Sequence, residues 1–287
     1  MTKKFKKPNQ TLKIPKIILV TGKFLSFIST NLAVRFAAKL FTTPIKHKIP
    51  KRELEMDSKS RQETIFIPSI RKKIVVYHFG ASQQKILLVH GWSGRGTQFF
   101  KFAEAFVKLG YETISFDAPA HGKSPSNSTL MPEFIESILE IDKQFGPFEA
   151  AVGHSLGGMS LLNAIKKGLN LNRLVIIGSG DVVQDIINDF VRKLELDVKF
   201  NDLLRIHFEN KHQLLMDSFS AYHAAKTVDF PTLVIHDQDD DEVPVSCAHH
   251  IHQNLKNGAL MLTENLGHRK ILGDAKVIQK TIQFITS

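Results

Sequence analysis

Residues 152–158 read VGHSLGG and set a serine between two glycines, at the end of the apolar run FEAAV. A strand that turns directly into a helix strains the residue at the turn, and flanking glycines let the two backbones approach each other. We therefore expect Gly153, Ser155 and Gly157 to form such a turn, with the Ser155 hydroxyl projecting outward. The following helix would direct N–H groups and the positive end of its dipole at the serine, which favours a negatively charged oxygen there.

Short apolar runs alternate with amphipathic stretches from residue 62 onward, a pattern typical of a mainly parallel sheet flanked by helices. The apolar runs predict eight strands, at 63–69, 72–80, 85–91, 111–117, 148–153, 174–179, 232–237 and 259–264. The first two are separated by a short turn and should form an antiparallel pair. Helices are predicted at 97–109, 131–145, 156–168, 245–257 and 271–285. The fold class is therefore α/β, with an eight-stranded, mostly parallel sheet.

The segment 181–230 is longer than a single crossover between two strands requires. The helical spacing of its apolar residues predicts several short helices, which would form a cap inserted into the fold. These apolar residues are Phe190, Leu194, Leu203, Leu204, Phe208, Leu214 and Leu215. The cap aromatics either line an apolar pocket or form the core of the cap, and we favour the core for most of Phe190, Phe200, Phe208, Phe219 and Tyr222.

The net charge of +10 belongs to the start of the chain, because residues 1–52 hold 13 Lys or Arg and no Asp or Glu, and the remainder is slightly acidic. Such a segment can attract anionic lipid or nucleic acid, although we expect no nucleic-acid partner. Residues 17–41 predict one amphipathic helix within a basic extension, 1–61. Lys23, Arg35 and Lys39 interrupt its apolar runs, so it is too short to span a membrane. It would pack on the protein or a second subunit, or lie on a membrane surface.

The single cysteine, Cys247, excludes an internal disulfide framework and a cysteine zinc site, and favours a reducing compartment. We expect a cytoplasmic protein, which would lie at the inner face of a membrane if residues 1–52 bind lipid.

The sequence has no phosphate loop, dinucleotide fingerprint or converging metal ligands, so we expect no cofactor and no metal. His249, His250 and His252 lie close together in sequence, but adjacent residues diverge on a helix.

The two groups that a nucleophilic serine requires follow it in the chain. For the base we select His268, in NLGHRKIL, because it follows the last predicted strand and can reach back over the sheet. For the acid we select Asp240, in HDQDDDEVP after the seventh strand, with Asp239 and then Asp181 as alternatives. The backbone N–H groups of Trp92, in VHGWSG, and of Leu156 would form an oxyanion hole.

The motifs HGWSG, DAPAHGKS, GHSLGG, HDQDDDEVP and GHRKIL occur in an order and at spacings that resemble the α/β-hydrolase superfamily, over roughly residues 62–287. The resemblance implies a Ser155, Asp240 and His268 triad, Trp92 and Leu156 as oxyanion donors, and a structural role for Asp117. Many relatives have His-Gly before the acid, whereas this chain has His236 followed by Asp237. The added carboxylate is expected to raise the pKa of one neighbouring acid. The first 60 residues have no counterpart in the minimal fold.

These features predict a serine hydrolase that forms an acyl-enzyme and cleaves a carboxylic ester of a small molecule with an apolar acyl group. A serine at the turn, rather than an aspartate, argues against dehalogenase and epoxide hydrolase chemistry. Thioesters, amides and carbon–carbon bonds beside a ketone use the same triad. The alternatives are an acyltransferase, in which the cap excludes water, and a non-catalytic binding protein on the same fold. The oligomeric state is not predicted.

Overall fold

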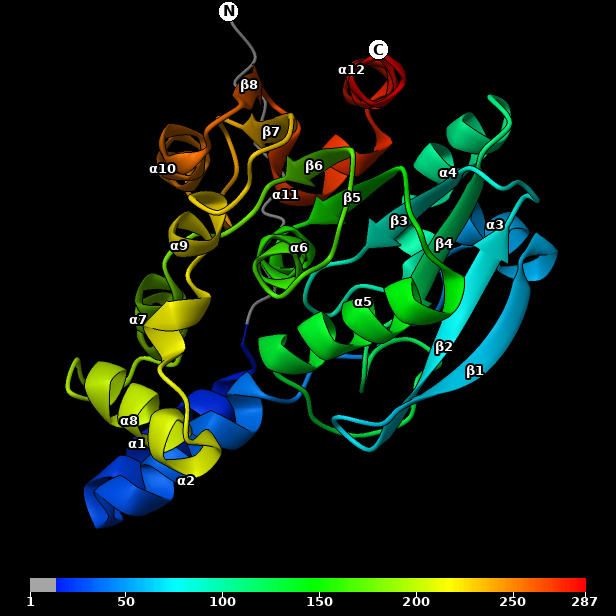
Figure 1. The fold of residues 1–287 in the computed structure, drawn as a ribbon. Helices are drawn as coiled ribbons and strands as arrows, with labels where there is room; N and C mark the ends of the chain where they lie inside the picture. The colour runs from blue at the N-terminus through cyan, green and yellow to red at the C-terminus, as the bar shows by residue number, and fades with distance from the viewer. Residues whose placement is uncertain (1–13) are drawn as a thin grey trace, which may run out of the picture.

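A computed structural model describes residues 14–287, which form an eight-stranded sheet with helices on both faces (Figure 1). The strand order is β1-β2-β4-β3-β5-β6-β7-β8. Strand β2 is antiparallel to β1 and to β4, and all other neighbours are parallel, which confirms the predicted fold class and opening pair. The strands are β1 Arg61–Ile67, β2 Lys72–Phe79, β3 Lys85–Val89, β4 Glu112–Asp117, β5 Ala150–His154, β6 Arg173–Ile177, β7 Thr232–Asp237 and β8 Gly258–Thr263.

The central strands are buried on both faces, as expected for a sheet covered by helices. In β3, Ile86 and Leu88 join the core beneath α4 (Phe100–Val107) and α12 (Ala275–Thr286). Leu87 and Val89 join the core that contains α5 (Met131–Phe145), α6 (Leu156–Lys166) and α10 (Ser246–Asn254). The carboxyl ends of β3 and β5–β8 therefore lie along one edge of the sheet, where α/β folds build their sites.

The predicted helices are present, with changes at their ends. The prediction 131–145 coincides with α5, whereas 97–109 divides into a 3₁₀ turn, η2 (Gly96–Phe99), and α4. Helix α6 ends at Lys166 because Gly168 adopts a left-handed conformation, with φ of 111°. The prediction 271–285 becomes η4 (Ile271–Gly273) and α12. Helix α11 (Gly267–Lys270), immediately before η4, was not predicted.

The segment between β6 and β7 is helical, as predicted, and contains α7 (Val183–Lys193), α8 (Phe200–His212), η3 (Met216–Phe219) and α9 (Ala221–Ala225). Phe200, Leu204 and Phe208 of α8 are buried. The prediction that Leu215 belongs to a helical apolar face is wrong, because its side chain is 71% exposed. Helix α8 ends at Gln213, whose φ of 52° turns the chain out of the helix before Leu215.

The single N-terminal helix predicted at 17–41 is instead two helices, α1 (Lys16–Ile28) and α2 (Thr30–Phe41). The break falls at Ser29, which has an extended backbone and whose side chain accepts a hydrogen bond from Leu32 N. A serine in this position caps a new helix and satisfies one of its free N–H groups. Helix α2 buries one face against the protein and contacts α8 of the cap, so packing on the protein is the alternative that holds for α2.

Residues 42–60 connect α2 to the sheet and carry two short elements that were not predicted, η1 (Lys51–Glu53) and α3 (Leu54–Lys59). The Glu53 carboxylate is buried, and Arg95 Nη1 and Thr97 Oγ1 each donate to it at 2.9 Å. Ile45 N donates to Ser93 Oγ at 3.0 Å. This connecting segment is therefore bonded to the loop that follows β3. Within residues 14–287, no helix is both long enough and apolar enough to cross a membrane.

Candidate active site

Ser155 lies between the end of β5 and the first residue of α6, with φ of 53° and ψ of −122°. A side chain rarely adopts this left-handed conformation, and such strain is concentrated at functional turns. The flanking glycines are required by close packing. A Cβ on Gly157 would lie 2.2 Å from Val89 O, and one on Gly153 would lie 2.8 Å from the Gly157 carbonyl carbon. The predicted turn from strand to helix is therefore present, and Ser155 is half-buried at its apex.

His268, in α11, and Asp240, in the loop after β7, are hydrogen-bonded to each other. His268 Nδ1 donates to Asp240 Oδ2 at 2.7 Å, and the other carboxylate oxygen accepts from Glu242 N at 2.9 Å and Val243 N at 2.8 Å. Burial raises the pKa of Asp240, but the hydrogen bonds from His268 and the two N–H groups outweigh it and hold the pKa below its ordinary value. An ionised carboxylate fixes the proton of His268 on Nδ1 and leaves Nε2 available as a base.

Ser155 and the His268–Asp240 pair meet at the ends of β5 and β6. Ser155 N donates to Ile177 O at 2.9 Å. Gly178 follows, and a Cβ on it would lie 3.4 Å from His268 Nδ1 and 3.6 Å from Asp240 Oδ2. The three predicted residues therefore come from separate parts of the chain to one edge of the sheet. Gly178 itself has a φ of 57°, a left-handed conformation that favours glycine.

His154, directly before Ser155, is a residue of this site that the sequence did not reveal. Its Nε2 donates to the backbone oxygen of His268 at 2.8 Å, and the two rings are 4.6 Å apart. Burial lowers the pKa of His154 to about 3, so its imidazole is neutral near pH 7. Its Nδ1 has no hydrogen-bond partner in the described part of the chain. Its position next to the turn serine is the only signal of this role in the sequence.

The alternative acids make other contacts. Asp239 Oδ2 accepts from Asn265 N at 2.8 Å, and Asp181 is hydrogen-bonded to His250 and to Tyr222 N. Asp237 is buried and accepts from Gly267 N at 2.9 Å and Thr263 Oγ1 at 2.7 Å. Asp237 therefore holds the loop before His268 in place through these hydrogen bonds. The expectation of a raised pKa next to Asp237 is wrong for Asp240, whose pKa is lowered.

The predicted oxyanion donors are backbone groups next to Ser155. Leu156 is the first residue of α6, and an N–H in the first turn of a helix has no acceptor within the helix. Trp92 lies in a turn closed by Gly94 N donating to Gly91 O at 3.0 Å. A Cβ on Gly91 would lie 2.8 Å from Ser155 Cβ, so this turn is directly beside the serine. The role of these two N–H groups as oxyanion donors stays a prediction.

Buried polar side chains brace the loops around the serine. His90 Nε2 accepts from Ala118 N and His121 Nε2 accepts from Ser93 N, each at 3.0 Å. Burial lowers the pKa of His90 to about 4 and that of His121 to about 2, so both are neutral acceptors near pH 7. Asp117 accepts from Gly96 N at 2.8 Å and Lys123 N at 2.7 Å, which matches the structural role that the resemblance implies. Burial raises the pKa of Asp117.

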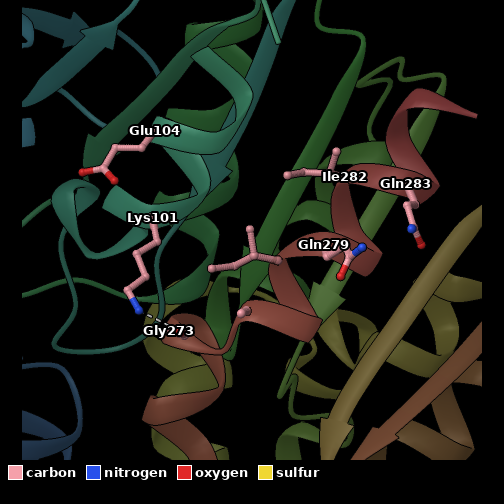
Figure 2. A pocket seen from close by; sticks show the side chains of 8 residues that line it. Lys101, Glu104, Gly273, Gln279, Ile282 and Gln283 are labelled. Atoms are coloured by element: carbon pink, nitrogen blue, oxygen red, sulfur yellow. Dashed lines mark hydrogen bonds between the residues drawn. The ribbon is translucent and has the colours of Figure 1, made fainter. Parts of the chain in front are cut away.

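A separate groove lies between α4 and α12, on the opposite face of the sheet from α6 (Figure 2). Two of its lining residues are hydrogen-bonded, Lys101 Nζ donating to Gly273 O at 2.7 Å, and none of the predicted site residues lines it. Among residues 14–287, no cluster of three or more His, Cys, Asp or Glu side chains could hold a metal ion.

A family model described as "alpha/beta hydrolase fold" matches residues 85–231, just over half of the chain. The chain belongs to the α/β hydrolase family. A second model, described as "TAP-like protein", matches residues 217–286 of this α/β hydrolase. The first match contains β3 to α9 and therefore the serine turn and the cap, and the second contains Asp240 and His268.

One curated relative and two solved structures illustrate the likeness. A 2-hydroxy-6-oxononadienedioate/2-hydroxy-6-oxononatrienedioate hydrolase of Paraburkholderia phymatum is 32% identical over an alignment of 113 positions, which covers 35% of this chain and only 38% of that relative. An esterase from Exiguobacterium antarcticum is 19% identical, with a TM-score of 0.59 over 76% of this chain and 97% of its own. A bacterial membrane phospholipase A is 16% identical, with a TM-score of 0.64 over 95% of this chain and 98% of its own. At these identities the two structures show a shared fold alone.

Proposed function

We propose that this α/β hydrolase is a serine hydrolase that cleaves the carboxylic ester of a small molecule through an acyl-enzyme intermediate. The observation that supports it best is the 2.7 Å hydrogen bond between His268 and Asp240, next to a serine in a strained turn. A buried carboxylate that holds a histidine in one tautomer is the arrangement that a serine hydroxyl needs in order to become a nucleophile. The relative that is named a hydrolase supports the same class of reaction.

The reaction would proceed in two halves. Ser155 Oγ attacks the ester carbonyl while its proton passes to His268 Nε2, and the N–H groups of Trp92 and Leu156 stabilise the resulting oxyanion. Collapse breaks the C–O bond to the leaving alcohol, which takes the proton from His268. Water then attacks the acyl-enzyme, giving its proton to His268, and the acid leaves as Ser155 regains a proton. Asp240 stays ionised throughout and stabilises the imidazolium form.

The acyl group is proposed to be apolar, because apolar side chains lie beside Ser155. Trp92 is 37% exposed, and Leu156 is half-buried in the first turn of α6. A Cβ on Gly180 would lie 3.2 Å from Met159 Sδ and 3.3 Å from Ile186 Cδ1 of the cap, so these two side chains also face each other near the end of β6. Such surroundings favour a hydrocarbon chain or an aromatic ring over a charged group.

A second candidate reaction is hydrolysis of a carbon–carbon bond beside a ketone. It is favoured by the partial likeness to the 2-hydroxy-6-oxo acid hydrolase, and the same Ser155, His268 and Asp240 would carry it out.

Acyl transfer to an alcohol or thiol is distinguished from hydrolysis by product analysis, since added acceptors would then divert the acyl group from water.

The test is hydrolysis of a series of p-nitrophenyl esters, from acetyl to lauroyl, with fluorophosphonate labelling in parallel. Ser155→Ala should lower turnover on the order of 10⁴-fold or more and abolish labelling, because no other group can form the acyl-enzyme. Ser58→Ala, at an exposed position on α3, is the matched control and should retain both. An intact protein that neither labels nor turns over any ester or oxo-dienoate would contradict the proposal.

A further inference from the structure

Helix α1 presents an exposed apolar stripe to the surroundings. Its residues are Ile17, Val20, Phe24, Phe27 and Ile28, of which Phe24 is 61% exposed and Phe27 is 90% exposed. At 100° per residue these five side chains fall within an arc of about 100°, which makes one continuous face of the helix. Exposed phenylalanines grouped in this way are uncommon on a free surface and indicate a contact with an apolar partner.

The opposite side of α1 is already occupied. Ile18 and Leu25 pack against the main hydrophobic core, and a Cβ on Gly22 would lie 3.6 Å from Leu196 in the cap and 3.7 Å from Phe36 of α2. Lys23 also forms an ion pair with Glu195, at the end of α7. Because α1 is held along this side, it can offer a partner only its apolar stripe. The helix must therefore lie flat on that partner.

The charge around the stripe is basic. Residues 1–52 contain 13 Lys or Arg and no acidic residue. Within the described residues 14–52 the exposed basic side chains are Lys16, Lys23, Arg35, Lys39, Lys46, Lys48, Lys51 and Arg52. On α1, Lys16 and Lys23 fall along one edge of the stripe. This combination matches a lipid bilayer with anionic headgroups, since the phenylalanines reach the acyl boundary and the ammonium groups stay with the phosphates.

We infer that α1 docks this protein flat on an anionic membrane surface through Phe24, Phe27 and their apolar neighbours. A second copy of the chain is the less favourable occupant, because a two-fold contact through α1 would bring two segments without a single acidic residue face to face. Binding to an anionic surface instead relieves the repulsion among these basic groups. The inference concerns binding alone and does not depend on the proposed reaction.

Docking would also give the site a fixed orientation relative to the lipid. Helix α2 contacts α1 and the cap, and the segment that follows it is bonded to the site loops, through Ile45 N to Ser93 Oγ at 3.0 Å and Lys46 Nζ to Ser124 O at 2.7 Å. In Figure 1, α1, α2 and α8 lie together at the end of the molecule remote from β1. Helix α1 therefore lies at the same end of the protein as the cap helix α8.

The test is flotation of the full chain with vesicles of phosphatidylcholine alone or mixed with phosphatidylglycerol, at low and high salt. The intact protein should float with the anionic vesicles, and binding should weaken as salt rises. Replacing both phenylalanines (Phe24→Ser and Phe27→Ser) should reduce partitioning at least about tenfold per residue, since each loses the burial of an aromatic ring. Phe66→Ser, at an exposed position on edge strand β1, is the matched control and should bind as the intact protein does.

Unchanged thermal unfolding of the double variant would show that any loss of flotation comes from the stripe. The inference is overturned if the intact protein stays with the unbound fraction in every vesicle, or if the double variant floats as well as the intact protein. It is also overturned if sedimentation shows a dimer that the two serines dissociate, because α1 would then be a contact between subunits.

Discussion

Ser155 has φ of 53° and ψ of −122°, and the surrounding packing holds it in that unfavourable conformation. The two flanking glycines allow the turn, and Ser179 Oγ donates to the Ser155 backbone oxygen at 3.2 Å. The histidine partner is held as firmly, because Asp237 binds the loop before it and His154 binds its carbonyl oxygen. These contacts hold the proposed nucleophile and base in position, which is what stabilising a transition state without reorganisation requires.

Asp240→Asn should lower kcat for a soluble ester by roughly 10³- to 10⁴-fold, because an amide cannot fix the proton of His268 on Nδ1. Asp239→Asn should retain most of the activity, because Asp239 Oδ2 contacts Asn265 N. Steady-state kinetics of both variants decide between the two acids. A large loss in Asp239→Asn with a small one in Asp240→Asn would contradict the pairing proposed for the site.

His154→Leu should lower kcat roughly tenfold or more with little change in KM, because His268 loses the donor that positions its backbone. His154→Gln keeps an N–H donor at a similar position and should restore most of the rate. Equal losses in the two variants, or a loss confined to thermal stability, would argue against a positioning role.

The cap and the N-terminal helices share one apolar core rather than forming separate units. The ring of Phe41, at the end of α2, lies 5.1 Å from Phe190 in α7 and 5.4 Å from Phe208 in α8. The cap aromatics Phe200 and Phe208 are buried, which agrees with the prediction that most of them form a core. Helix α2 therefore stabilises the cap.

Phe41→Ala should lower the free energy of unfolding by about 3 kcal/mol, because it removes a ring packed between two others and leaves a cavity. Phe27→Ala, which removes a ring that is 90% exposed on α1, should change stability by less than about 0.5 kcal/mol. Urea unfolding followed by circular dichroism measures both. Equal effects of the two substitutions would mean that the contact between α2 and the cap contributes little to the free energy of unfolding.

At the scale of the whole molecule, several histidines are buried near the site. Burial lowers the pKa values of His90, His121 and His154 to about 4, 2 and 3, and it also lowers the pKa of His236. As pH falls below the ordinary histidine value of 6.5, the unfolded chain takes up protons that the folded protein does not. Stability therefore decreases toward acid, by up to about 1.4 kcal/mol per pH unit for each such histidine.

His121→Gln should remove one of these contributions, so that stability falls less steeply between pH 6.5 and 5, by roughly 1 kcal/mol per unit. The glutamine can still accept the hydrogen bond from Ser93 N. Urea titrations at several pH values across this range measure the slope for the intact protein and the variant. Identical slopes would show that His121 takes up its proton in the folded state.

The order of strands and helices could be predicted because it depends on local features of the chain: apolar periodicity, chain length between elements, and turn residues such as Gly153 and Gly157. Alternating burial in β3 and the strand-to-helix turn at Ser155 are properties of neighbouring residues, so they are visible in one dimension. The family motifs also indicated Ser155 and His268, because each follows a predicted strand at the carboxyl edge of a parallel sheet.

The sequence selected Asp240 as the acid, with Asp239 and Asp181 as alternatives, but only the folded protein shows which groups each carboxylate contacts. Asp237, paired with Thr263 at the end of β7, bonds the loop before His268, whereas Asp240, in the loop that follows, bonds the His268 ring; no local pattern records this difference. The same holds for the N-terminal helices. Their apolar residues predict helices with a face to bury, whereas the contact of α2 with the cap and the exposure of α1 follow from long-range packing.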